Sequence, residues 1–376
     1  MKSQRREGTD RADAAKLQYT LGPAPEAAAL SSLWRKLEAH AESSFFQSWG
    51  WLGTWHAALP PGQTLLLFTG SRHGNVVCLA LLGVRGNKRH YISETGDPEI
   101  DQLTVEYNGM LIERGSLPLL ASDFLPALLA MLPPKAGLVA SGVKEDYLAA
   151  PITEAFSRQI RATKTVHAVE LSALRDDGMP SLGKSTQAKI RQSLARYSRL
   201  GEIRLSEARD VKEAVAVFDR LAALHQTYWQ GRGRRGAFAS PFIRQFHHAL
   251  IEERFGAGEI QLLRLAAGDA PIGYLYNFRY RQRIYAYQSG FDYALVAKAR
   301  PGYLCHWHAL RHNWKAGAEI YDFLAGTDQM KQAFANKTET LHWLRFRRKT
   351  LLYAIETGLR STKRAASSFF ARSGRG

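Results

Sequence analysis

The chain has 376 residues, of which 45% are hydrophobic and 23% are charged. This balance is ordinary for a soluble globular protein and excludes a chain too polar to bury a core, and the length favours two domains. The formal net charge of +17 is not ordinary, and it indicates an anionic partner such as a phosphorylated cofactor, nucleic acid or an anionic membrane.

The first α/β unit is preceded by residues 1–25, which are polar and then rich in Ala and Pro, so we predict a mostly disordered lead-in. Helices are expected over 26–40 and over the aromatic segment 43–55. Alternating apolar residues then predict three strands: 65–69, 75–84 and 89–93.

A strand with polar side chains at its centre is predicted over 104–112. Glu106 and Asn108 would share one face of it, because side chains alternate along a strand. A solvated sheet edge is the alternative to the acceptor-binding role that we assign to both residues. A helix over 122–132 and a strand over 137–141 complete this unit.

A second α/β unit begins near Lys164 with a strand over 166–171 and a helix that ends at Gly201. The helix carries five basic side chains and no acidic ones: Lys184, Lys189, Arg191, Arg196 and Arg199. A solvated basic face accounts for them, and contact with substrate phosphates or an anionic surface is the alternative.

Two further segments precede the central stretch. Asp210 and Glu213 have the residue types of a capping box that opens a helix to Tyr228. The Gly- and Arg-rich segment 231–236 matches neither a P-loop nor a dinucleotide fingerprint, because Gly-Lys-Ser/Thr and a preceding strand are missing. We interpret it as a mobile basic loop beside the site.

The stretch 259–324 organises the rest of the chain. Aromatic and aliphatic residues alternate in three predicted strands: 259–266, 272–280 and 283–289. A basic loop with Pro301 and Gly302 then starts a helix, and a strand follows over 319–324. Free backbone N–H groups at such a helix start favour phosphate, so this stretch is predicted to bind an anionic cofactor.

The C-terminal part holds a last predicted strand over 339–347 and a basic tail. Residues 341–376 contain nine Lys or Arg against the single Glu356, which is about half of the net charge. The end of the tail is rich in Ser, Ala and Arg, and we predict it to be disordered.

Cysteine content and apolar runs bear on the compartment. Cys78 and Cys305 cannot form a disulfide framework and have no paired metal-ligand spacing, which fits a reducing cytosol. The longest apolar runs, such as 76–82, are far shorter than the roughly 20 residues that span a bilayer. We predict a cytoplasmic protein and leave open a peripheral position on the inner face of the membrane.

Several motifs, in this order and spacing, carry a resemblance to a known family. They are Phe46-Gln47-Ser48-Trp49-Gly50-Trp51, the basic helix ending Leu200-Gly201, Leu224-His225-Gln226-Thr227-Tyr228-Trp229, Tyr287-Gln288-Ser289-Gly290-Phe291-Asp292, Pro301-Gly302, and Tyr321-Asp322-Phe323-Leu324 followed by Asp328-Gln329-Met330-Lys331. Over residues 40–347 the chain resembles a tandem of GNAT acyltransferase domains. It is most similar to the bacterial cellulose-biosynthesis (CelD-like) acetyltransferases, whose architecture resembles that of the Fem-type aminoacyltransferases.

The resemblance implies a mixed α/β fold with two GNAT domains. An N-terminal domain over 26–163 would form the acceptor side, and a C-terminal domain over 164–350 would bind acyl-CoA, with acetyl-CoA as the expected donor. The basic tail would cover 351–376.

Seven residues are implied as cofactor-binding, because in this family the strand 283–289 holds the pantetheine and the next helix start holds the pyrophosphate. They are Tyr285, Gln288, Ser289, Lys298, Arg300, Gly302 and Tyr303. The loop 298–303 departs from the usual Gln/Arg-x-x-Gly-x-Gly/Ala form. It has one glycine, and Pro301 removes one N–H donor, so another activated acyl carrier is a possible replacement for CoA.

Acyl transfer needs a base, a proton donor for the leaving thiolate and dipoles that face the oxyanion. We assign Asp322 as general base or orienting group, Tyr287 as proton donor and Lys331 to charge stabilisation, with Trp229 beside Glu106 and Asn108 at the acceptor. Each has a structural alternative: Asp322 as a cap or partner of an arginine, Tyr285 and Tyr287 as core aromatics, and Lys331 as an exposed lysine.

No metal is expected, although three histidines follow Cys305. His308 and His312 would share a helix face, but the His-Glu-x-x-His pattern and a third ligand are missing. Cys305 and His306 are adjacent, and adjacent residues of a helix do not face each other, so a Cys–His nucleophile is not expected either.

Three functions remain at this level. The first is an acyl-CoA-dependent transferase that acts on a small amine, a sugar or an envelope-polysaccharide precursor. The second is a Fem-like transferase that uses charged tRNA, for which the net charge is suitable. The third is a non-catalytic protein that binds nucleic acid or an anionic membrane through the basic tail and the helix 184–200.

Overall fold

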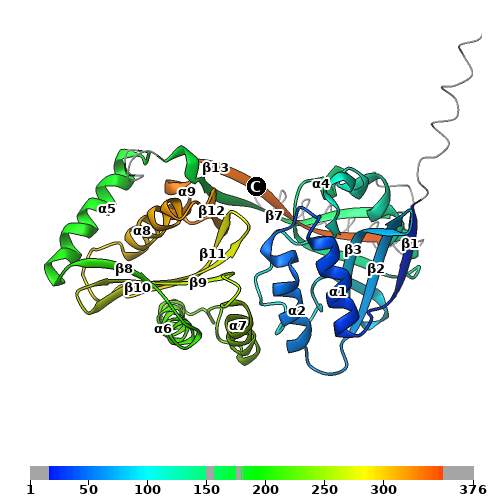
Figure 1. The fold of residues 1–376 in the computed structure, drawn as a ribbon, viewed down its shortest axis with the longest axis horizontal. Coiled ribbons are helices and arrows are strands. Elements are labelled where there is room, and N and C mark those ends of the chain that lie inside the picture. Colours follow the sequence, from blue (N-terminus) through cyan, green and yellow to red (C-terminus); the bar gives the residue numbers. More distant parts are fainter. Residues whose placement is uncertain (1–16, 150–155, 175–178, 180, 350–376) are drawn as a thin grey trace, which may run out of the picture.

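The computed structural model describes residues 17–149, 156–174, 179 and 181–349. The basic tail 351–376 and most of the predicted lead-in lie outside these residues. The protein has two halves that lie side by side, and two long strands pass from one half to the other (Figure 1).

The first half contains both helices that the sequence predicts near its start. Its elements are β1 (Gln18–Pro23), α1 (Ala27–Glu38), α2 (Trp49–Ala58), β2 (Thr64–Arg72), β3 (Asn75–Arg85), β4 (Arg89–Ile92), β5 (Leu111–Ile112), α3 (Leu125–Met131), β6 (Gly137–Val143) and α4 (Asp146–Ala149). Residues 18–23 were predicted to be disordered, but they form β1 and pair with β2. Ser48 caps α2 by accepting a hydrogen bond from the Trp51 N–H at 3.2 Å.

In the second half, the stretch 259–324 has the predicted order of three strands, a helix and a strand. β7 (Phe156–Glu170) is the last strand of the first half in chain order. The elements of the second half are α5 (Lys184–Tyr197), β8 (Ile203–Glu207), α6 (Val211–Gln230), α7 (Pro241–Arg254), β9 (Ile260–Ala267), β10 (Ala270–Tyr280), β11 (Arg283–Phe291), α8 (Pro301–Lys315), β12 (Ile320–Ala325), α9 (Gln329–Phe334) and β13 (Lys337–Arg348). The predicted cap of α6 is present, since the Asp210 carboxylate accepts from the Glu213 N–H at 2.8 Å.

One mixed sheet runs through both halves and repeats the same pattern twice. Its strand order is β1-β2-β3-β4-β6-β13-β7-β12-β11-β10-β9-β8, with β5 beside β3. In each half an antiparallel meander ends on a strand that pairs in parallel with the strand after a helix. These parallel pairs are β4 with β6 and β11 with β12.

The two halves exchange their last strands. β7 follows the first half in the chain but pairs with β12 of the second half, and β13 ends the second half but pairs with β6 of the first. β7 and β13 also pair with each other over twelve residue pairs. The central part of the sheet therefore contains strands of both halves in alternation.

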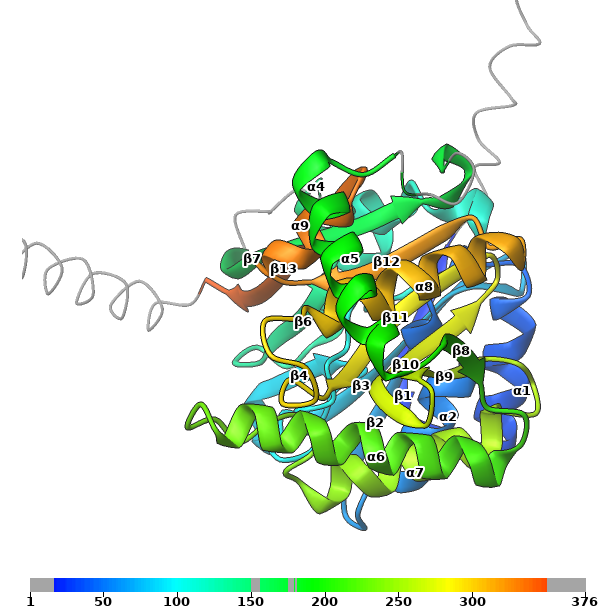
Figure 2. The ribbon, with the colours of Figure 1, turned by 90° about the vertical axis from the view of Figure 1, so that its left-hand side faces the viewer.

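Helices cover both faces of the sheet in the second half. α5 and α8 lie on one face, and α6 and α7 lie on the other (Figure 2). One hydrophobic core joins the halves, because Trp51 of α2 packs against Phe246 of α7 at 4.9 Å and Phe278 of β10 at 5.7 Å between ring centroids. The aromatic segment 43–55 is thus an inter-half core element.

The predicted strand over 104–112 is wrong except for its last two residues, which form β5. Tyr107 has a φ of 52° and Gly109 has a φ of 140°, and this left-handed backbone cannot continue a strand. Glu106 and Asn108 therefore do not share a strand face.

Candidate active site

A cavity of 660 Å³ opens where β11 and β12 separate. The two strands pair only from Arg283–Ile320 to Tyr285–Asp322. Beyond that point a bulge in β11 leaves Tyr287 without a partner on β10, and a second irregularity follows Asp322 in β12. Bulges increase strand bending, which lets the two strands diverge.

The start of α8 forms one end of this cavity. Arg300, Gly302 and Tyr303 line it, and the first N–H groups of a helix have no acceptor within the helix. The Arg300 N–H donates to Ser193 Oγ of α5 at 3.0 Å, which ties the loop to the basic helix. Lys189 of α5 lies with Nζ 3.3 Å from the Tyr303 hydroxyl. Positive charge therefore gathers at this end.

Gly302 is needed for a close approach of α8 to its neighbours. A Cβ atom there would lie 3.1 Å from Met330 Sδ and 3.2 Å from the Phe291 ring. The same residue was predicted from the sequence as part of the cofactor loop. Lys298, also predicted, has a φ of 59° and does not line the cavity; its carbonyl accepts a hydrogen bond from Arg196 of α5.

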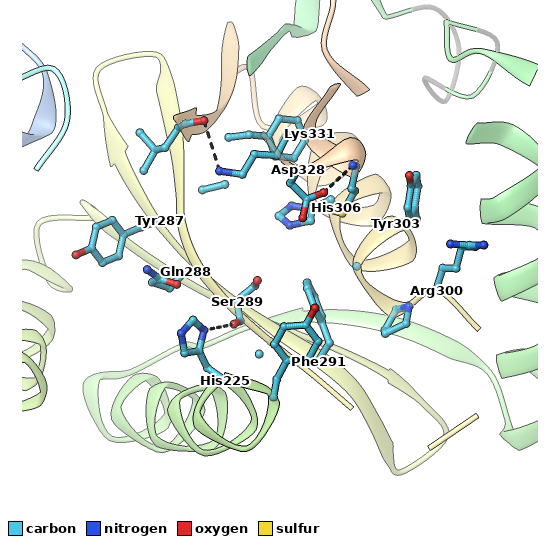
Figure 3. Close-up of a pocket in the computed structure, with 18 of the residues that line it drawn as sticks. His225, Tyr287, Gln288, Ser289, Phe291, Arg300, Tyr303, His306, Asp328 and Lys331 are labelled. Carbon is cyan, nitrogen blue, oxygen red and sulfur yellow. Dashed lines mark hydrogen bonds between the residues drawn. The ribbon is translucent and has the colours of Figure 1, made fainter. Parts of the chain in front are cut away.

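The wall opposite α8 is formed by β11 and α6 (Figure 3). Tyr287, Gln288 and Ser289 of β11 line it together with Trp229 of α6. His225 of α6 lies with Nδ1 3.1 Å from the Ser289 carbonyl, and its Nε2 accepts from the Ala237 N–H at 3.2 Å. These two partners require a neutral ring with the proton on Nδ1. His225 therefore ties α6 to β11 and to the loop that follows α6.

At the other end of the cavity, Glu106 and Lys331 both contact the backbone of Ala325. Glu106 comes from the first half and accepts from the Ala325 N–H at 2.6 Å, while Lys331 of α9 donates to the Ala325 carbonyl at 3.2 Å. Both side chains line the cavity. The residue that joins them follows Leu324, whose φ is 61°.

Burial changes the acidity of both groups. It raises the pKa of Glu106 to about 7, while the Ala325 N–H and the nearby Lys331 act in the opposite direction. Burial also lowers the pKa of Lys331, although neighbouring carboxylates oppose the shift. Glu106 can therefore exchange a proton near neutral pH, as a general base must.

Tyr287, which the sequence analysis assigned as proton donor, and His306, to which it assigned no role, also line the cavity. The Tyr287 hydroxyl is hydrogen-bonded by the Thr104 backbone, and burial raises its pKa. His306 of α8 lines the cavity, with Nδ1 3.1 Å from the Tyr321 hydroxyl, and burial lowers its pKa to about 3. The sequence analysis assigned His306 no role, and its place in the second turn after Pro301 was the available signal.

Asp322, Tyr285 and Asn108 do not line this cavity. The fully buried Asp322 carboxylate accepts from the Tyr107 hydroxyl at 2.6 Å and the Leu324 N–H at 2.7 Å, and it pairs with Arg283 at 3.0 Å. This is the structural alternative that the sequence left open, a partner of an arginine. Tyr285 is buried in the hydrophobic core, which is the structural alternative that the sequence analysis gave for it.

Asn108 lies at the corresponding strand separation of the first half. Its N–H donates to the Gly142 carbonyl of β6 at 3.1 Å, and its Nδ2 donates to the Ile92 carbonyl of β4 at 2.8 Å. β4 and β6 pair only over Arg89–Tyr91, as β11 and β12 do over three residues. The segment 104–110 therefore fills the first half's separation and carries Glu106 into the second half's cavity.

Comparisons with known proteins agree with this geometry. Residues 184–332 match the model of an acetyltransferase (GNAT) domain family. The match contains β11, β12 and the start of α8, which form the cavity. It covers less than half of the chain, and the sequence has no significant match among curated proteins.

Solved structures share the fold at low sequence identity. The crystal structure of FemX is 11% identical, covers 90% of this chain and 99% of its own, and has a TM-score of 0.57. L-PGS from Bacillus licheniformis is 12% identical, with 93% and 97% coverage and a TM-score of 0.52. The C-terminal DUF2156 domain of an Agrobacterium fabrum protein is 13% identical, with 88% and 95% coverage and a TM-score of 0.52.

The fold is of the GNAT type. The mixed α/β architecture and the GNAT fold predicted from the sequence are thereby confirmed. In the described residues, no helix is long and apolar enough to cross a membrane, and no three His, Cys, Asp or Glu side chains gather where they could hold a metal ion.

Proposed function

We propose that the protein transfers an acyl group, with acetyl from acetyl-CoA as the first candidate, to an amine or hydroxyl of a small molecule, a sugar or an envelope-polysaccharide precursor. The observation that carries the proposal is the cavity between β11 and β12, which has a cationic helix start at one end and the Glu106–Lys331 pair at the other. The proposal includes membership of the cellulose-biosynthesis (CelD-like) acetyltransferase family, which the motifs of the sequence resemble.

The donor would lie along β11. Its pantetheine would pass the backbone of 286–290, which has no β12 partner, and its pyrophosphate would meet Arg300 and the N–H groups of Gly302 and Tyr303. Pro301 offers no N–H, and Arg300 with the nearby Lys189 supplies positive charge in its place. The chain thus compensates for its unusual loop with side chains.

The reaction needs no covalent enzyme intermediate. The acceptor lone pair attacks the thioester carbonyl carbon while its proton passes to Glu106, and the Lys331 ammonium stabilises the tetrahedral oxyanion. The C–S bond then breaks, and Lys331 protonates the thiolate. Transfer of the proton held by Glu106 to Lys331 restores both groups.

The test is thermal unfolding with acetyl-CoA, longer acyl-CoAs and CoA, followed by an assay for released thiol with amine and sugar acceptors. We expect acyl-CoA to raise the Tm of the wild-type protein and of Lys331→Met, whose defect lies in turnover, but to have little effect on Arg300→Gln. A Tm that no CoA ester changes would contradict CoA as donor.

An aminoacyl donor is the second candidate. The Agrobacterium fabrum protein of similar fold carries the name 'putative lysylphosphatidylglycerol synthetase', and FemX also shares the fold. The basic helix α5 beside the donor end of the cavity favours an anionic carrier larger than CoA. Transfer of an aminoacyl group from charged tRNA, with no transfer from acyl-CoA, would favour this second candidate. Binding of tRNA without any transfer would favour a non-catalytic binding protein.

A further inference from the structure

A row of polar side chains crosses the sheet of the second half and ends at the cavity. It begins at Glu207 of β8 and continues through Gln261 of β9 and Asn277 of β10. Tyr321 of β12 follows, and it contacts His306 of α8, which lines the cavity. We call these five residues the polar row. Buried polar groups are costly unless they are hydrogen-bonded, so the partners of each group reveal which atom donates and which accepts.

Glu207 sets the direction of the first hydrogen bonds in the row. Burial acts to raise its pKa, but hydrogen bonds from His312 and Arg279 bring the pKa down to about 2, so the group is a carboxylate. Arg279 donates to it twice, at 2.6 and 2.7 Å. A carboxylate only accepts, so Gln261 must present its Nε2, which donates to Glu207 at 3.2 Å. The Oε1 atom of Gln261 is therefore left to accept from the next residue.

Asn277 passes this direction on to Tyr321. Its Nδ2 donates to Oε1 of Gln261 at 2.8 Å, and turning the amide over would set two acceptor oxygens against each other. Burial raises the pKa of Tyr321, and a hydrogen bond with the Asn277 side chain acts in the opposite direction. A hydrogen bond that lowers the pKa of a phenol is one that the phenol oxygen accepts. Asn277 therefore donates to Tyr321 as well.

The proton of the Tyr321 hydroxyl goes to His306. The hydroxyl lies 3.1 Å from Nδ1 of His306, and the Oδ1 atom of Asn277, which would be the competing acceptor, is buried without a partner. Burial lowers the pKa of His306 to about 3, and the charge of Lys331 acts in the same direction, so the ring is neutral. A neutral ring that accepts at Nδ1 carries its proton on Nε2. The polar row thus selects one tautomer of this histidine.

The Nε2–H group of His306 faces the cavity. Because Nδ1 contacts the buried Tyr321, the opposite edge of the ring, with Nε2, is the one that lines the cavity. Nε2 of His308 is buried without a partner, whereas Nε2 of His306 is not fully buried, and no protein group among the described residues is hydrogen-bonded to it. In Figure 3 the ring lies between Tyr303, at the cationic end, and Lys331, at the reaction end. A ligand that spans the two ends would pass this N–H group.

We propose that His306 is a donor-binding residue, whose neutral Nε2–H group hydrogen-bonds a carbonyl oxygen of the pantetheine arm of acyl-CoA, and that the polar row holds this proton in place. The inference rests on the proposed function for the identity of the donor. The direction of the row is a property of the protein itself. An uncharged N–H group suits the uncharged amide carbonyls of pantetheine. Glu207 touches no substrate and is a positioning residue.

The tautomer is tested by nitrogen-15 NMR of the full-length protein labelled at histidine. The spectrum of His306→Gln identifies the signals of this ring among the twelve histidines. We expect its proton on Nε2 in the wild-type protein. The amide of the Glu207→Gln variant can donate to Oε1 of Gln261 and lets the row reverse, so we expect the Nδ1–H tautomer to appear. The matched control is Glu202→Gln, which removes an exposed carboxylate that pairs with Arg204 and should leave the signals unchanged.

The binding role is tested by titration calorimetry with CoA. We expect His306→Leu to weaken CoA binding about three- to tenfold, which corresponds to one lost hydrogen bond. His306→Gln keeps an N–H donor and should recover part of the affinity. Glu207→Gln should weaken binding by a smaller factor, because only part of the ring population loses the Nε2 proton, and Glu202→Gln should have no effect.

Steady-state kinetics separate binding from catalysis. The contact with pantetheine is the same in the ground state and the transition state, so His306→Leu should raise the KM for acyl-CoA and change kcat little. A lower kcat with an unchanged KM would overturn the inference, because His306 would then act on the reacting carbonyl. If His306→Leu fails to fold, the comparison of Glu207→Gln with Glu202→Gln carries the test.

The remaining outcomes distinguish this inference from the proposed function. An Nδ1–H tautomer in the wild-type protein, or equal CoA affinity of the wild-type protein and His306→Leu, would overturn the inference and leave the transferase standing. If the wild-type protein does not bind CoA at all, CoA is removed as the donor, and the role of His306 in binding it is removed too. An Nε2–H tautomer that reverses in Glu207→Gln, together with weaker CoA binding in His306→Leu, would support the inference.

Discussion

Glu106 is the residue on which the pH dependence of activity should rest. Its pKa is raised to about 7 by burial, so the carboxylate form that accepts a proton is lost as the pH falls below 7. We expect kcat/KM to rise with pH and level off above neutrality, with an acid limb near pH 7. Glu106→Gln should lower kcat by about 10²-fold or more and remove that limb.

The same residue should affect stability with the opposite tendency. The folded-state pKa of about 7 lies above the ordinary glutamate pKa of 4.5, so the folded protein holds this proton more tightly. The free energy of unfolding therefore falls as the pH rises from about 4.5 through 7. Glu106→Gln should therefore stabilise the protein at pH 8, by up to about 3 kcal/mol, and have little effect at pH 4. Urea unfolding at both pH values measures this difference, and an equal effect at both would argue against a raised pKa.

Asp322 should contribute to stability rather than to turnover. Its carboxylate is fully buried and engaged by Arg283, Tyr107 and the Leu324 N–H. Asp322→Asn leaves Arg283 without that charge, which we expect to cost about 3 kcal/mol of unfolding free energy. Glu339→Gln, which removes the more exposed partner of Arg283 at 3.1 Å, is the control and should cost below about 1 kcal/mol. A large loss of kcat with unchanged stability would return Asp322 to the mechanism.

Sequence reasoning at this scale identified many lining residues but not their arrangement. The family resemblance implied Gln288, Ser289, Arg300, Gly302 and Tyr303, and all five line the cavity. They lie within one continuous strand–loop–helix segment of the chain. That Glu106 and Lys331 contact the same residue, Ala325, could not be predicted from the sequence. The contact of Glu106 with Ala325 joins residues 219 positions apart, which a local pattern cannot reveal.

The start of α8 sets the width of the cavity at its cationic end. Gly302→Val would place atoms where Met330 Sδ and Phe291 lie 3.1 and 3.2 Å from the first added carbon. We expect the KM for the donor to rise at least tenfold, since a loss of 1.4 kcal/mol is already tenfold. The steady-state KM for acyl-CoA measures this. Gly183→Ala, at the start of α5 with open space around it, should leave the KM unchanged.

Element prediction succeeded where the pattern was local and failed where the backbone was unusual. The strands of 259–291 and the helix after Pro301 follow from alternation and from the proline at the first helical position. The segment 104–110 has apolar residues at strand spacing, but Tyr107 and Gly109 have positive φ and its hydrogen bonds go to β4, β6 and α4. Those partners are distant in sequence, so a local pattern cannot reveal them.

The whole molecule should unfold as one unit despite its two halves. β7 and β13 each complete the other half's sheet, and Trp51 joins the aromatic core of both. We expect a single calorimetric transition whose van't Hoff and calorimetric enthalpies agree. Trp51→Ala should lower the stability of both halves together, by about 3 kcal/mol or more. Two resolved transitions would show that the exchanged strands do not couple the halves.

The strand exchange itself could not be predicted from the sequence. The residues of β7 and β13 have ordinary strand patterns that fit either half, and strand order depends on contacts between distant segments. The two α/β units were predicted from the order of their elements. That order is the same whether each half keeps its last strand or exchanges it with the other half.

The segment 104–110 has a consequence for which amino acids the chain can tolerate. Asn108 holds β4 and β6 apart with its own amide groups, and Glu106, two residues earlier, reaches the other half's reaction end. A substitution that loosens the packing of the first half would therefore also displace Glu106 in the cavity of the second half. In a saturation mutagenesis experiment, this segment should therefore be as intolerant as a catalytic motif, although it lies in the half where the separation between β4 and β6 is filled.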